Sequence, residues 1–202
     1  MSPSNGDSCC VQDRVLNAAE SIVARDGVAN LTLEAVAREA GISKGGLLYH
    51  FPSKSALITA IVERLGQRCD NEQLKAIESD PCEVGRFTRA YLTARAEPPD
   101  PKDEPIHSAL IAAAGTDPQF LAPMLERFKL WQQRLESDGI DPAAAMIVRL
   151  AIDGFCLGTL LGIPVPTGEL RRKVLDRLLE MTRHRAEQTI APKAAPAPVR
   201  PS

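Results

Sequence analysis

The stretch LTLEAVAREAGISKGGLLYHFPSKSAL, residues 31–57, decides the fold of this chain. Thr32 and Ser43 are residue types that cap the N-termini of helices, and Gly41 is the type that ends a helix. The stretch therefore predicts two short helices, one from Thr32 to Gly41 and one that begins at Ser43. Ala37 is small enough to face Gly41 across a tight turn, which is the spacing of a helix-turn-helix.

The second short helix is expected to turn a polar face outward. Burial of Ile42 and Leu47 against the neighbouring helices leaves Lys44, Tyr49 and His50 on the other side. These side chains suit phosphate oxygens and the edges of bases, so the face is a candidate DNA surface. Packed helical proteins that bind no nucleic acid share the same turn, and the turn alone leaves that alternative open.

The longer run AVAREAGISKGGLLYHFPSKSAL resembles the signature of the TetR family of bacterial transcriptional regulators. The resemblance covers roughly residues 11–65. It implies a ligand-responsive regulator, in most cases a repressor, that binds a palindromic operator in double-stranded DNA as a homodimer. It also implies a small-molecule effector, held in the C-terminal part, whose binding releases the DNA.

The resemblance assigns DNA contacts to positions at the start of the first short helix, along the second, and just after it: Thr32, Ser43, Lys44, Gly45, Gly46, Leu48, Tyr49, His50 and Lys54. Many members have Thr where this chain has Gly46 and Tyr where it has Leu48. A hydroxyl contact is lost at each position, and Tyr49 is expected to replace the aromatic phosphate partner.

The remaining chain predicts an all-α fold, because apolar residues recur at helical spacing and no stretch alternates like a strand. We expect a disordered N-terminus over 1–10, a helix-turn-helix DNA-binding domain over 11–65, a larger helical effector-binding and dimerisation domain over 66–190, and a disordered Pro/Ala-rich tail over 191–202. A long helix should follow Ser53. Later helices are expected at 82–96, 106–114, 118–136, 142–161 and 168–187, with a Pro-rich break over 97–105.

The segment 142–161 is apolar almost all round and must be buried on most sides, in a protein or in a membrane. Arg149 and Asp153 lie in its middle and make a membrane span unfavourable, whereas in a helix they can form an i,i+4 ion pair. Glycines recur every four residues, which favours close approach of another helix. We therefore expect a homodimer through the last two helices, with Gly154, Gly158, Leu170, Val174, Leu178 and Met181 at the interface.

An effector pocket is expected among the middle helices, on the resemblance to proteins that hold a ligand there. The candidates are mostly apolar, which favours an apolar effector, and ordinary core packing is the alternative for each of them: Phe87, Tyr91, His107, Phe120, Met124, Phe128, Trp131, Met146, Leu150, Phe155 and Cys156.

Composition excludes several other classes of protein. The 202 residues are 44% hydrophobic and 25% charged, which is ordinary for a soluble globular protein. Five cysteines without a CxxC spacing and a polar N-terminus favour a reduced, cytoplasmic compartment. Three separated histidines and the absence of GxSxG and HExxH motifs indicate neither an enzyme nor a metal or cofactor site.

The formal net charge of −2 does not exclude a DNA partner, because the acid is concentrated in residues 69–142, whereas residues 42–54 hold two Lys, one His and no acid. A helical enzyme or carrier, and a helical protein that dimerises without DNA, remain the rival functions.

Overall fold

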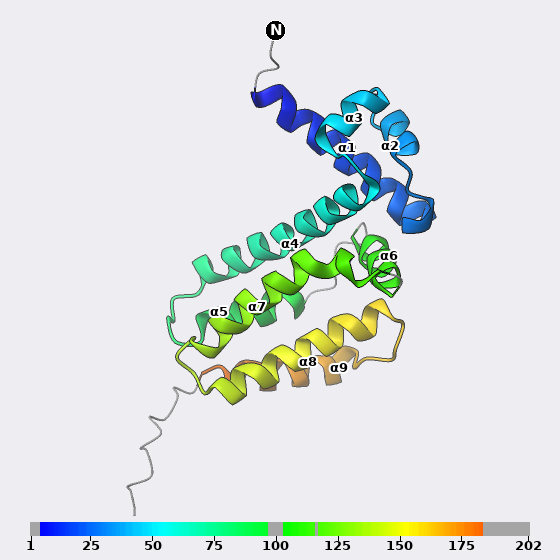
Figure 1. Ribbon diagram of the computed structural model, residues 1–202. Helices are drawn as coiled ribbons and strands as arrows, with labels where there is room; N and C mark the ends of the chain where they lie inside the picture. The colour runs from blue at the N-terminus through cyan, green and yellow to red at the C-terminus, as the bar shows by residue number, and fades with distance from the viewer. Residues whose placement is uncertain (1–4, 97–102, 116, 184–202) are drawn as a thin grey trace, which may run out of the picture.

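The structure is a computed structural model, and it describes residues 5–96, 103–115 and 117–183. The elements in these ranges are helices, which confirms the predicted all-α class (Figure 1). In chain order they are α1 (Asn5–Asp26), η1 (Val28–Asn30), α2 (Leu33–Glu39), α3 (Lys44–His50), α4 (Lys54–Ser79), α5 (Arg86–Ala96), α6 (Glu104–Ala114), η2 (Pro118–Leu121), α7 (Ala122–Glu136), α8 (Pro142–Leu160) and α9 (Gly168–Met181).

Three hydroxyl side chains cap the helices of the N-terminal region, as their residue types predict. Thr32 Oγ1 accepts a hydrogen bond from the backbone N–H of Ala35 at 3.1 Å and so caps α2. Ser43 caps α3 and Ser53 caps α4 in the same way. Gly41 ends α2 with a φ of 65°, a left-handed conformation that favours glycine, so the predicted turn is confirmed.

The first hydrophobic cluster joins the helix-turn-helix to the rest of the chain. It contains Leu31, Val36 and Leu47 of the N-terminal region together with Ile106 and Leu110 of α6. The boundary expected between residues 65 and 66 falls inside α4, which continues unbroken to Ser79. The two expected domains therefore share a helix and a core, with no linker between them.

Buried charges reinforce this junction between α1, α4 and the start of α6. Glu20 of α1 is almost buried and accepts hydrogen bonds from Arg64 at 2.8 Å and Arg68 at 2.7 Å, both on α4. Arg68 also pairs with Asp103, the residue before α6, at 2.5 Å. An acid with two basic partners satisfies the requirement that buried charges be paired.

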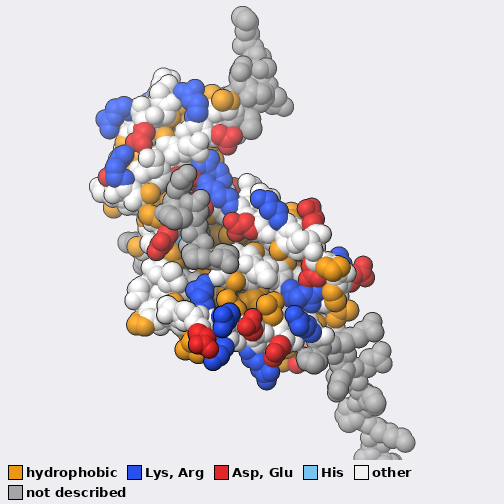
Figure 2. All heavy atoms as spheres, turned by 180° about the vertical axis from the view of Figure 1, so that it is seen from behind, with side chains coloured by type: hydrophobic (Ala, Val, Ile, Leu, Met, Phe, Trp, Pro, Cys, Tyr) orange, Lys and Arg blue, Asp and Glu red, His pale blue; other side chains and the backbone are white. Residues whose placement is uncertain are grey.

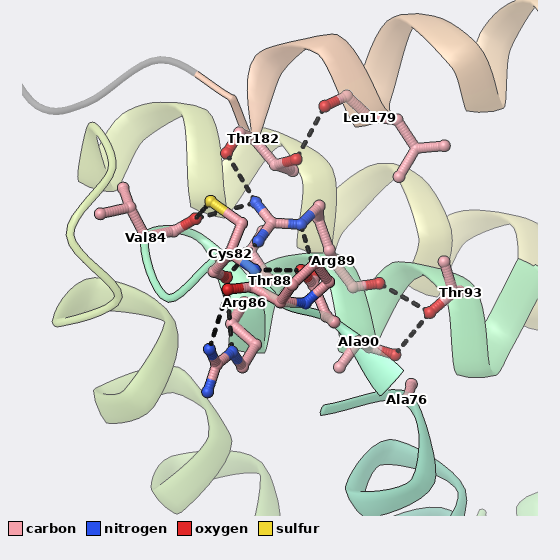
Figure 3. Close-up of polar contacts among 12 residues, drawn as sticks. Ala76, Cys82, Val84, Arg86, Thr88, Arg89, Ala90, Thr93, Leu179 and Thr182 are labelled. Atoms are coloured by element: carbon pink, nitrogen blue, oxygen red, sulfur yellow. Dashed lines mark hydrogen bonds and ion pairs between the residues drawn. The ribbon is translucent and has the colours of Figure 1, made fainter. Parts of the chain in front are cut away.

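The second hydrophobic cluster lies between α5, α7, α8 and α9, which stack below α4 in Figure 1 with α8 and α9 outermost. The turn before α5 is held by Arg89, whose guanidinium donates to the carbonyls of Cys82, Val84 and Thr182 (Figure 3). It also pairs with Asp80 at 2.6 Å. Arg89 thereby ties the end of α9 to the connection between α4 and α5.

Several helix ends differ from the expected ones for local reasons. Helix α1 begins at Asn5, inside the segment expected to be disordered, because no proline interrupts it there. Helix α5 begins at Arg86 rather than at residue 82, since Gly85 is left-handed at φ 73° and Asp138 caps the backbone N–H groups of Phe87 and Thr88. The segment 118–136 divides into η2 and α7, and α9 ends at Met181. The expected tail over 191–202 lies outside the described residues.

Candidate functional site

The candidate DNA surface is formed by α3 and the first turn of α2. Thr32, Ser43, Lys44, Gly45, Gly46, Leu48 and Tyr49 are all exposed, whereas His50 and Lys54 are half-buried. Tyr49 is 78% exposed, which is unusual for a large aromatic side chain. Its ring meets that of His50 edge to face, with 5.0 Å between the centroids.

The two lysines of this surface already have partners within the chain. Lys44 Nζ lies 2.5 Å from Oε1 of Glu34, which stands in the first turn of α2. Lys54 Nζ donates to the carbonyl of Ala29 in η1 at 3.1 Å. The sequence reasoning missed Glu34, although an acid in the first turn of α2 was visible as a possible partner for a lysine at the start of α3.

The two glycines of α3 differ in what surrounds them. A Cβ on Gly46 would lie 3.3 Å from Ser43 Oγ, the atom that caps the helix, whereas a Cβ on Gly45 would meet nothing within 4 Å. Gly45 therefore leaves open space on the exposed side of the helix, where another molecule could approach the backbone closely.

The structure brings most of the effector-pocket candidates together in the second hydrophobic cluster. Trp131 lies at the centre, edge to face with Tyr91 at 5.8 Å and with Phe128 at 5.3 Å between ring centroids. The candidates in or against this cluster are Phe87, Tyr91, Met124, Phe128, Trp131, Met146 and Phe155.

Polar side chains that the sequence reasoning did not select also enter this cluster. The guanidinium carbon of Arg95 lies 3.8 Å from the centroid of the Tyr91 ring and 4.5 Å from that of Trp131. Trp131 Nε1 donates to Asp70 of α4 at 2.8 Å, and the Tyr91 hydroxyl donates to Asp153 of α8 at 2.7 Å. Burial raises the pKa of Tyr91 well above its usual value, and the neighbouring Asp153 carboxylate adds to the rise.

Four effector-pocket candidates are not part of this cluster. One is Cys156 of α8, whose thiol contacts the carbonyl oxygen of Arg95 at 3.9 Å. Leu150 is 66% exposed on the outer side of α8, so its assignment to an interior pocket is corrected. Phe120 packs against the first hydrophobic cluster. His107 lies on α6 with Nδ1 buried and without a hydrogen-bond partner among the described residues, and burial lowers its pKa.

Two depressions on the described part of the surface contain none of the effector-pocket candidates. One of about 500 Å³ lies between the end of α4, α5 and α9 and includes Arg89 and Leu179. The other, of about 270 Å³, lies at the end of α9 beside Arg177 and Met181. The candidate effector residues are packed against one another instead, with Tyr91 and Trp131 almost fully buried.

The residues expected at a dimer interface divide into two groups. Leu178 is only 5% exposed and belongs to the core of the chain itself, whereas Val174 and Met181 are half-buried and pack against the same second cluster. Gly158 is also buried, because Val165 from the α8–α9 connection lies over it. Gly154 and Leu170 are exposed. The interface assignments of the buried Leu178 and Gly158 are corrected accordingly, and those of the other four residues stay predictions.

An exposed apolar stripe runs along α8 in place of the expected set. Its members recur at alternating intervals of four and three residues, and each is exposed: Ala143, Ile147, Leu150, Gly154, Leu157 and Leu161, the last just past the helix end. The exposed side of α9 is charged instead, and Figure 2 shows red and blue side chains mixed along this lower part of the molecule.

Helix α8 is long and apolar enough to cross a membrane by length and composition alone, with a mean hydropathy of 1.6. Its inner side packs in the second cluster through Val148, Ile152 and Phe155. Arg149 pairs with Asp153 at 3.4 Å, as the i,i+4 spacing predicts, and donates to Gln132 of α7 at 2.7 Å. Over the described ranges, no three His, Cys, Asp or Glu side chains are grouped so that they could hold a metal ion.

Both the N-terminal and the C-terminal part of the chain match known protein families. Residues 15–61 match the family described as bacterial regulatory proteins, tetR family. Residues 85–183 match the tetracyclin repressor-like C-terminal domain. A helix-turn-helix followed by a regulatory helical bundle defines the class, and the chain belongs to the TetR family. This is a family of regulatory proteins rather than of enzymes.

Individual relatives match over only part of the chain. The transcriptional regulator UidR of Escherichia coli strain K12 is 37% identical over 74 residues, which are 37% of this chain and 35% of UidR. EthR of Mycolicibacterium smegmatis is 29% identical over 75 residues, 37% of this chain and 35% of EthR. The matched part of the chain thus spans about a third of the length of these curated relatives.

Solved structures share the whole fold. A TetR-family member from Streptomyces coelicolor A3 superposes with a TM-score of 0.64 at 24% identity, covering 83% of this chain and 97% of the other. The multidrug binding protein EbrR, complexed with malachite green, superposes with a TM-score of 0.65 at 21% identity, covering 89% of this chain and 99% of EbrR. At these identities the likeness concerns the fold alone.

Proposed function

We propose that this protein is a ligand-responsive transcriptional repressor of the cytoplasm that binds a palindromic operator as a homodimer. The observation that carries the proposal is the exposed face of α3, where Lys44 and Tyr49 project from a helix that Ser43 caps. A lysine, an exposed aromatic ring and open space at Gly45 suit the entry of this helix into a major groove.

The DNA surface is tested with the double variant Lys44→Ala, Tyr49→Ala. We expect it to lose binding to the promoter fragment of its own gene in a mobility-shift assay, because both candidate contacts are removed while the core is untouched. Lys75→Ala, which removes an exposed lysine from the far part of α4, is the control and should bind as the wild type does. Retained binding by the double variant would show that other residues make the contacts.

The exposed stripe on α8 supports the homodimer. Its alternating spacing of four and three residues is that of a coiled-coil seam, and Gly154 at its centre permits close approach of a second helix. Exposed apolar side chains recurring at this spacing mark a surface that is covered in the working state. A second copy of α8 fits the stripe, because a two-fold axis brings the same surface of both chains together.

Leu157→Glu tests the dimer. Leu157 is 48% exposed, so a carboxylate there is compatible with the folded chain but would be desolvated in the interface. We expect monomers in sedimentation. Leu74→Glu on α4, where the leucine is 50% exposed, is the matched control and should leave the dimer unchanged. An unchanged dimer with Leu157→Glu would move the interface away from this stripe.

The second hydrophobic cluster supports the effector part of the proposal. Its aromatic rings suit an apolar molecule, and the relative EbrR is a multidrug binding protein. Trp131, the sole tryptophan of the chain, lies in this cluster and reports on it. We expect an apolar compound that releases the promoter fragment to change the fluorescence of Trp131 over the same concentration range. Release without such a change would place the effector elsewhere.

A further inference from the structure

Glu34 is an acidic residue beside the candidate DNA contacts, and it forms an ion pair with one of them, Lys44. Its Oε1 lies 2.5 Å from Lys44 Nζ, and both side chains are more than half exposed, at 62% and 56%. The hydrogen bond from Lys44 lowers the pKa of Glu34. Lys44 therefore meets DNA with its charge already paired.

Glu34 lies between two candidate DNA contacts, Thr32 and Lys44. Glu34 lies in the first turn of α2, two residues after Thr32, and reaches across to the first residue of α3. A DNA phosphate that approaches Lys44 must displace the carboxylate or accept its repulsion. An exposed ion pair adds little to stability. Glu34 differs from other paired surface acids such as Glu39 because its partner, Lys44, is a candidate DNA contact.

We propose that the carboxylate of Glu34 competes with DNA phosphates for Lys44. This competition lowers the affinity of the protein for non-cognate DNA. The inference rests on the proposed function, since it assumes that α3 meets DNA. Non-specific binding comes almost entirely from lysine and arginine contacts to phosphate, each of which releases a counterion. When Glu34 keeps Lys44 paired, each protomer makes one phosphate contact fewer with random-sequence DNA, and non-specific binding is weaker. At the operator, the other contacts bring a phosphate close enough for Lys44 to leave Glu34.

The chain offers a matched control in Glu39. It stands at the other end of α2 and pairs with Arg25 of α1 at 3.4 Å rather than with a candidate DNA contact. Glu34→Gln and Glu39→Gln each remove one negative charge from the same short helix. Long-range attraction to DNA rises in both variants, but only Glu34→Gln frees Lys44.

The experiment measures the affinity of the full chain for a random-sequence duplex by fluorescence anisotropy over a range of salt concentrations. For Glu34→Gln we expect the slope of log K against log salt to steepen by about 0.9 per protomer bound. That corresponds to an extra gain of about threefold per protomer when salt falls fourfold. Glu39→Gln should keep the wild-type slope, and adding Lys44→Gln to Glu34→Gln should abolish the gain.

The outcomes separate this inference from the proposed function. If both Glu34→Gln and Glu39→Gln bind the duplex with equal slopes of log K against log salt, the proposed competition by Glu34 is wrong, and the DNA-binding function is unaffected. No duplex binding by any of the proteins, including to the promoter fragment, would overturn both. Thermal melts of both glutamine variants should match the wild type, because each substituted side chain is at the surface.

Discussion

His107 is a half-buried histidine whose Nδ1 has no hydrogen-bond partner among the described residues. Burial lowers its pKa, Arg68 lowers it further, and Asp103 and Glu72 act in the opposite direction. The folded chain therefore favours the neutral ring. An unfolded histidine has a pKa of about 6.5, so the stability that depends on the neutral ring is fully present above about pH 6.5 and is lost as the pH falls.

His107→Gln should flatten this acid-side loss of stability. We expect the free energy of unfolding of the wild type, measured with urea, to fall between about pH 7 and about pH 5, and that of His107→Gln to change less over the same interval. Identical pH profiles for the wild type and His107→Gln would contradict the prediction.

At the residue scale, local features could be predicted from the sequence and cross-helix partners could not. The capping roles of Thr32 and Ser43 depend on residues three positions away, and the structure confirms them. The partnership of Trp131 with Asp70 joins residues 61 positions apart and depends on how α4 crosses α7. Residue type alone does not specify such a crossing.

At the element scale, the inner and outer sides of α8 show what an apolar pattern leaves undecided. Almost every position of this helix is apolar, so the sequence does not show which side faces the chain's own core. Leu150 is predicted to line an effector pocket but faces outward. Gly158 is predicted to lie at a dimer interface but is covered by Val165. Packing against α5 and α7 decides the rotation of the helix.

Gly158→Ala should destabilise the chain. A Cβ at this position would lie 2.5 Å from Val165 Cγ1, so the Val165 side chain or the α8–α9 connection must shift. Overpacking of this kind costs about 1–3 kcal/mol, which exceeds the gain in helix propensity of about 1 kcal/mol. Chemical denaturation measures the loss. Gly45→Ala, whose Cβ meets no atom within 4 Å, is the control and should be stabilising. Equal stability of the two variants would contradict the assigned contact.

At the scale of the whole molecule, helix order was predictable, whereas the contacts that join the two predicted domains were not. The capping and breaking residues predicted the sequence of helices, because each signal is local. The predicted boundary at residue 65 falls within α4, and Ile106 and Leu110 of α6 join the hydrophobic cluster of the helix-turn-helix. Contacts between distant segments decide where one core ends and another begins.

The shared core predicts a single unfolding transition. Far-UV circular dichroism follows all helices, and the fluorescence of Trp131 follows the second hydrophobic cluster alone. We expect the two signals to give the same denaturation midpoint, because α4 contributes to both clusters. A CD signal that changes in two steps, with fluorescence following only one, would show that the halves unfold independently.

Helix α4 is long enough that a small tilt about one end produces a large displacement of the other. It has 26 residues without a break, a length of about 39 Å at 1.5 Å per residue. Its N-terminal end lies directly after α3, and its later half holds Asp70, which is bonded to Trp131. A tilt of about 5° about its far end displaces the near end by about 3.4 Å, the rise of one base pair. A tilt of this size would move α3, which directly precedes α4, by a distance comparable to one base-pair step.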